Sequence, residues 1–60
     1  MEVEKFNAYL KGVMRMADFF HRNREDSFLL TVLSAEMERD DLTGWQRRQV
    51  YNAATSYLRP

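Results

Sequence analysis

The sequence predicts an all-α fold: one domain, residues 1–60, in which helices over about residues 3–22, 27–39 and 43–58 form a compact three-helix arrangement. Apolar side chains recur at intervals of three and four residues, which is the period of a helix. Only Gly12, Gly44 and Pro60 are potential helix breakers, and two short polar stretches separate the apolar segments. Because connections this short favour antiparallel neighbours, we expect consecutive helices to fold back on one another.

The first predicted helix carries more apolar residues than one stripe needs. Its continuous stripe consists of Val3, Phe6, Leu10, Val13, Ala17 and Phe20. Four further apolar residues lie outside it: Tyr9, Met14, Met16 and Phe19. On the polar side, Asp18 precedes Arg22 by four residues, the favourable order for a helical ion pair. Gly12 costs about 1 kcal/mol relative to alanine, so it marks either a close helix crossing or no special feature.

The second predicted helix is apolar around most of its circumference. It follows a polar break at residues 23–27, in which Asp26 and Ser27 are the N-cap candidates. Seven of the ten residues from 28 to 37 are apolar. A helix of this kind lies at the centre of a core, and two neighbours of similar length cannot cover it completely. We therefore expect either a sandwiched helix with modest exposure or an uncovered side that contacts another chain.

The third predicted helix has a clear start signal. The stretch 40–44 forms the second turn, and Thr43 is followed three residues later by Gln46, which fits a capping box. From there the helix is expected to continue to about residue 58.

Two charged residues occupy apolar positions on these consecutive helices. Glu36 lies within the apolar arc of the second helix, and Arg47 intrudes on the apolar face of the third. Folding the third helix back brings both to the same level, and a buried charge needs a partner. We therefore predict a structural ion pair between Glu36 and Arg47. If their charged groups lie apart, Glu36 is instead the best candidate for an acid that faces a partner.

Chain length and composition predict self-association. Sixty residues are close to the lower limit for a self-sufficient core, and such small domains need a disulfide, a metal or a partner subunit. The sequence has no cysteine and one histidine, His21, so we expect no disulfide, metal or cofactor. Asp18, His21 and Glu25 share one side of an extended first helix, where a solvated charge cluster is favoured over a metal or proton-transfer site. A homo-oligomer is the remaining source of stability.

Charge and motifs favour a protein that works by contact rather than by catalysis. The net charge is zero, divided as +2, −5 and +3 among residues 1–24, 25–41 and 42–60. This division suits pairing between folded-back helices, or steering of a charged partner. The sequence contains no cysteine nucleophile, no phosphate-binding loop and no convincing Ser–His–acid set, so we expect neither an enzyme nor a small-molecule substrate.

We therefore predict a small regulatory or adaptor protein that binds another protein, as an inhibitor or modulator, and also binds itself. Surplus apolar surface marks contact sites, and flexible methionines suit irregular partners. The contact candidates are Tyr9, Met14, Met16, Phe19, Leu30 and Met37. An acidic N-terminus and the lack of a long apolar run predict a cytoplasmic protein that does not enter membranes. By analogy of size, we expect an origin in a phage or another mobile element.

A DNA-binding regulator is the alternative. The second and third helices have the outline of a helix-turn-helix, and one outward stripe of the third carries side chains suited to nucleic acid: Arg48, Asn52, Thr55 and Arg59. However, Asp40 stands where that motif has a small apolar residue, and the chain lacks a basic excess. Nucleic acid is therefore the second choice of partner, and a purely structural assembly subunit is a third class.

Overall fold

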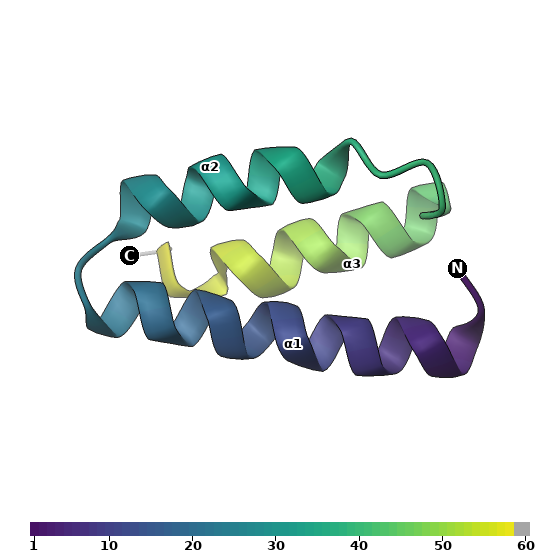
Figure 1. Ribbon diagram of the computed structural model, residues 1–60, viewed down its shortest axis with the longest axis horizontal. Helices are drawn as coiled ribbons and strands as arrows, with labels where there is room; N and C mark the ends of the chain where they lie inside the picture. The colour runs from purple at the N-terminus through teal and green to yellow at the C-terminus, as the bar shows by residue number, and fades with distance from the viewer. Residues whose placement is uncertain (59–60) are drawn as a thin grey trace.

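The computed structural model describes residues 1–58 and confirms the predicted all-α, three-helix arrangement. Helix α1 spans Val3–Arg22, α2 spans Asp26–Met37 and α3 spans Gly44–Thr55, followed by a 3₁₀ turn, η1, at Ser56–Leu58. The chain runs along the bundle, back and forth again, so that α1 and α3 point the same way and α2 opposes both (Figure 1). Each helix contacts the other two.

Helix α1 has the predicted bounds and ends in a hydrogen-bonded cap. The amide of Glu25 donates to the carbonyl of Phe20 (2.8 Å), and the amide of Arg24 donates to that of His21 (3.0 Å). This pair of bonds is a Schellman motif. Arg24 has φ of 57°, the left-handed conformation that this motif requires and that glycine adopts most easily. The predicted ion pair between Asp18 and Arg22 is confirmed, with the charged atoms 3.1 Å apart.

Helix α2 begins one residue before the predicted start and ends two residues before the predicted end. The prediction of Asp26 or Ser27 as its N-cap is wrong. The N-cap is Glu25, whose side chain makes no capping hydrogen bond. Because the amide of Glu25 already closes α1, no loop remains in which Asp26 or Ser27 could act as a cap. The carboxylate of Asp26 instead lies 3.3 Å from Nδ1 of His21.

Helix α3 begins with the predicted capping box. The amide of Gln46 donates to Oγ1 of Thr43 (3.1 Å), and the amide of Thr43 donates to Oε1 of Gln46 (3.0 Å). The side-chain amide of Gln46 also donates to the carbonyl of Met1 (2.6 Å). This buried glutamine therefore fixes the start of the chain against the start of α3. The regular helix ends at Thr55, and the remaining predicted residues form the tighter η1 turn.

The core draws on all three helices and on the turn before α3. Its buried apolar members are Phe6, Val13, Ala17, Leu29, Leu33, Leu42, Val50 and Ala54. Many large apolar side chains nevertheless stay exposed: Val3, Met14, Phe19, Phe28, Leu30, Trp45, Tyr51 and Tyr57. Within residues 1–58, no helix has the length and apolar character needed to cross a membrane.

Candidate protein-contact surface

Helix α1 has a second apolar stripe beside the one that enters the core. Tyr9, Gly12, Met16 and Phe19 follow one another at spacings of three, four and three residues, so they share one side of the helix. This side is turned toward α2 and solvent, whereas Phe6 and Val13 are buried in the core. The second stripe therefore forms one edge of the space between α1 and α2.

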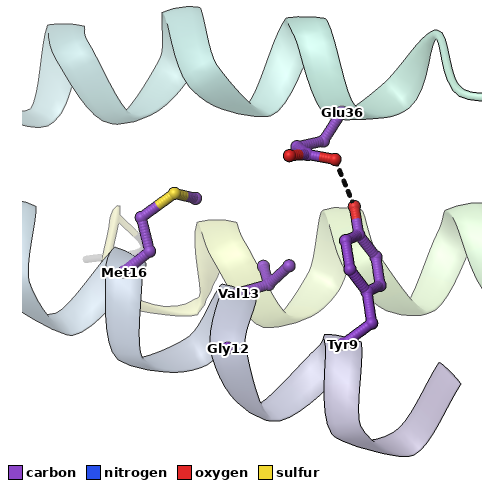
Figure 2. A pocket seen from close by; sticks show the side chains of 5 residues that line it. All are labelled: Tyr9, Gly12, Val13, Met16 and Glu36. Carbon is purple, nitrogen blue, oxygen red and sulfur yellow. Dashed lines mark hydrogen bonds between the residues drawn. The ribbon is translucent and has the colours of Figure 1, made fainter. Parts of the chain in front are cut away.

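A shallow hollow of about 280 Å³ lies between α1 and α2. Its lining consists of Tyr9, Gly12, Val13, Met16 and Glu36. Figure 2 shows the side chains of Val13 and Met16 directed into this space from α1, with Glu36 reaching down from α2 and α3 passing behind. We call this surface the α1–α2 face. It consists of the hollow, Arg39 at one end, and Phe19, Phe20 and Phe28 at the other.

Gly12 leaves the middle of this face open. A Cβ atom at position 12 would meet no atom within 4 Å, and the backbone has no positive φ there. The packing of this chain therefore does not require glycine at position 12. The close helix crossing considered from the sequence is not made by α2 or α3, and the exposed backbone can be approached closely only from outside.

A polar network closes one end of the face. The hydroxyl of Tyr9 donates to Oε2 of Glu36 at 2.6 Å (Figure 2), and the guanidinium of Arg39 lies 4.9 Å from the centre of the Tyr9 ring. Burial, followed by the hydrogen bond to Glu36, raises the pKa of Tyr9 to about 12. Arg39 also donates two hydrogen bonds to Asp41, which lower the pKa of that carboxyl. One Glu36 oxygen is thus held by Tyr9 while the carboxylate stays at the opening.

An aromatic cluster lies at the other end of the face. The rings of Phe19 and Phe20 are 5.6 Å apart edge to face, and the rings of Phe20 and Phe28 are also 5.6 Å apart. Phe20 is half-buried, whereas Phe19 is 59% exposed and Phe28 61% exposed. Two large rings from different helices therefore present most of their surface to solvent next to the hollow. Such clustered exposure is typical of a binding surface.

The predicted ion pair between Glu36 and Arg47 is wrong. The guanidinium of Arg47 donates from Nε to the carbonyl of Met37 (2.9 Å) and from Nη2 to the carbonyl of Arg39. The first carbonyl belongs to the last residue of α2, where the helix leaves acceptors unsatisfied and carries partial negative charge, and the second lies two residues beyond it. Arg47 therefore caps α2. Glu36 lies on the other side of that helix, bonded to Tyr9 and 3.7 Å from Arg39.

The six predicted contact residues do not form one surface. Tyr9 and Met16 line the hollow, and Phe19 lies beside it. Met14 is exposed on another side of α1, and Leu30 is exposed on α2 away from Glu36. Met37 is half-buried against the core. Half of the predicted set thus comes together on the α1–α2 face.

The cluster of Asp18, His21 and Glu25 is divided among different contacts. Asp18 pairs with Arg22, and His21 lies beside Asp26 with its ring stacked on that of Tyr57 at 5.4 Å. In the part of the chain that the structure describes, no group of three His, Asp or Glu side chains is arranged to hold a metal ion. These contacts tie the end of α1 to α2 and η1.

The residues of the nucleic-acid alternative lie on the outer side of α3. Arg48 and Asn52 are exposed, and the hydroxyl of Thr55 donates to the carbonyl of Tyr51 (2.7 Å). Arg59 lies outside the described residues. Helices α2 and α3 lie alongside one another (Figure 1), whereas a helix-turn-helix holds its two helices at about 90–120°. The geometry therefore gives this alternative little support.

Phe28 and Gly12 belong to the face but were not among the predicted contacts. Phe28 belongs to the apolar run of α2, from which Leu30 and Met37 were the predicted contacts instead. Gly12 carries no side chain, and its meaning depends on whether a neighbouring helix fills the space above it. The alternation of spacings through Tyr9, Gly12, Met16 and Phe19 was a signal that could have identified the stripe.

Comparisons with protein-family models, with curated proteins and with solved structures find no significant match to this chain. Function is therefore inferred from the residues and their arrangement.

Proposed function

We propose that this chain is a small regulatory or adaptor protein that acts without catalysis, by binding another protein through its α1–α2 face. The observation that carries the proposal is the pairing of two mostly exposed rings, Phe19 and Phe28, with an open apolar hollow beside them. Aromatic residues and methionine are enriched at protein interfaces, where they supply much of the binding energy.

The size and lining of the hollow favour a protein over a small molecule. Ligand pockets commonly enclose about 300–1,000 Å³ and surround most of the ligand, whereas this hollow has about 280 Å³ and is open to solvent. The polar groups that line the hollow, the hydroxyl of Tyr9 and the carboxylate of Glu36, are hydrogen-bonded to each other. A helix or loop of another protein can cover the hollow and both exposed rings at once.

Site-specific photo-crosslinking in cells that express the protein tests the proposal. A benzoylphenylalanine replaces Phe28 in one variant and Tyr51 in a matched control, because Tyr51 is also an exposed aromatic residue but lies on α3. We expect a discrete protein adduct from position 28 and none from position 51. The adduct should disappear when Met16→Ala or Phe19→Ala is added.

The other classes of function give different results. Adducts with nucleic acid from position 51, together with salt-dependent duplex binding that Arg48→Ala abolishes, would replace the proposal with the DNA-binding alternative. Adducts between copies of the chain alone would indicate an assembly subunit. Equal crosslinking from both positions would show that the α1–α2 face has no special role.

A further inference from the structure

We propose that a second copy of this chain binds the α1–α2 face, with the two α1 helices crossing antiparallel at Gly12 around a two-fold axis. This inference goes beyond the proposed function, because it names a second occupant, which would compete with the other protein for the same surface. A two-fold axis places residue i of one copy opposite residue j of the other, and j opposite i. The pattern of residues around Gly12 can therefore be checked for self-complementarity.

Three pairs of residues stand at equal numbers of residues before and after Gly12, so the two-fold axis would place each member opposite the other member in the second copy. The two members of each pair are complementary in size or charge. Four residues away on either side stand Ala8 and Met16, a small and a large side chain. Seven residues away stand Lys5 and Phe19, and the stem of a lysine can cover an exposed ring with its ammonium over the ring face. Ala8, Lys5 and Phe19 are all exposed in the single chain. An antiparallel crossing at Gly12 therefore sets the small Ala8 against Met16 and the stem of Lys5 against Phe19.

The third pair supplies opposite charge. Tyr9 and Arg15 stand three residues on either side of Gly12, so Arg15 of the second copy comes level with Tyr9. Tyr9 is bonded to Glu36, and Figure 2 shows the other oxygen of that carboxylate directed along the hollow toward Met16. Arg15 is exposed and makes no ion pair with any residue from 1 to 58. The crossing would form two Arg15–Glu36 pairs, one in each direction.

The available area suits a dimer of this kind. A stable interface removes about 800 Å² of accessible surface from each partner, which is about a fifth of the 4481 Å² that this chain exposes. Gly12 allows the two backbones to approach closely, as small residues do at other helix crossings.

Sedimentation equilibrium from about 1 μM to about 1 mM tests the inference with charge reversals. We expect a dimer whose Kd rises at least about tenfold with Arg15→Glu, because two acids then face each other. Glu36→Arg should weaken the dimer similarly, and the double variant should recover a Kd within about threefold of the original. Lys11→Glu is the matched control, since Lys11 is an exposed base one residue from Gly12 that does not line the hollow.

A second variant tests the crossing point without changing charge. Gly12→Leu should abolish the dimer while the helical circular dichroism of dilute protein is unchanged, because a Cβ at position 12 has open space within one chain. A protein that stays monomeric to about 1 mM would overturn the inference. A dimer insensitive to both Gly12→Leu and Arg15→Glu would also overturn it. Neither outcome affects a crosslink from position 28 to a different protein, so the proposed function is tested separately.

Discussion

Helix α1 contacts its two neighbours in different ways. Toward α3, the ring of Phe6 is buried with its centre 6.1 Å from that of Trp45, and Ala17 and Ala54 are both fully buried. Toward α2, the same helix lines an open hollow. A Cβ atom at Gly12, in the lining of this hollow, would meet no atom within 4 Å. The contact between α1 and α3 is also more extensive than that between α1 and α2. Parallel helices distant in sequence thus pack more closely than the consecutive antiparallel pair.

This difference separates the residues that stabilise the bundle from those that remain for binding. Tight packing between α1 and α3 fixes the shape of the domain and buries Phe6, Ala17 and Ala54 in the core. The open face between α1 and α2 adds less to stability, so its composition is set less by folding. Substitutions in the two regions should therefore have opposite consequences for stability and association.

The largest effect is expected from truncating Phe6, in comparison with Phe19 on the other side of α1. Phe6→Ala should lower the free energy of unfolding by about 3–5 kcal/mol, because it removes a buried ring from the α1–α3 contact. Phe19→Ala should cost about 1 kcal/mol, mainly from the lost edge contact with Phe20. Urea denaturation of dilute protein measures both values. Equal costs would show that the two sides of α1 contribute equally to folding.

A polar side chain also strengthens the α1–α3 side. Gln46→Ala should cost about 1–3 kcal/mol, because it removes half of the capping box and the hydrogen bond to the carbonyl of Met1. Gln49→Ala is the control, since Gln49 lies on the same helix and makes no hydrogen bond with its side chain among residues 1–58. Thermal unfolding of the two variants should differ clearly. A loss for Gln46→Ala no larger than that for Gln49→Ala would contradict the assigned role.

A stabilising substitution is expected on the α1–α2 face. Gly12→Ala should raise the free energy of unfolding by about 0.5–1 kcal/mol, because alanine favours helix and its methyl group has free space. Urea denaturation at micromolar concentration reports the effect in the single chain. A destabilised variant would show that the hollow is narrower in solution than in the structure.

The sequence predicted the helices well because their signals are local. The spacing from Val3 to Phe20 defined α1, and Thr43 with Gln46 defined the start of α3. The start of α2 was predicted less well, because the amide of Glu25 is recruited by the preceding helix. This recruitment depends on the left-handed backbone conformation of Arg24. An arginine at that position does not predict such a conformation.

The contact surface was harder to predict because it depends on how the helices are rotated. Glu36 and Arg47 both stood out as charges among apolar residues, and pairing them was the simplest solution. Arg47 instead found the unsatisfied carbonyls at the end of α2, and Glu36 found the hydroxyl of Tyr9. Backbone acceptors and a tyrosine hydroxyl are not visible as partners in a pattern of charges. Only the position of α2 over α1 brings Tyr9 and Glu36 together.

A further predicted effect concerns the hydrogen bond across the α1–α2 face at high pH. Because the pKa of Tyr9 is raised to about 12, above the usual value of 10.0, folding favours the neutral phenol. The resulting stability is present below pH 10 and is lost as the pH rises from about 10 to about 12. Absorbance at 295 nm should show Tyr9 ionising near pH 12, and Glu36→Gln should lower that midpoint by removing the adjacent negative charge. In Tyr9→Phe, which lacks the phenol, this component of the loss of stability should be absent. An unchanged alkaline profile in Tyr9→Phe would show that the bond between Tyr9 and Glu36 does not help to hold α1 and α2 together.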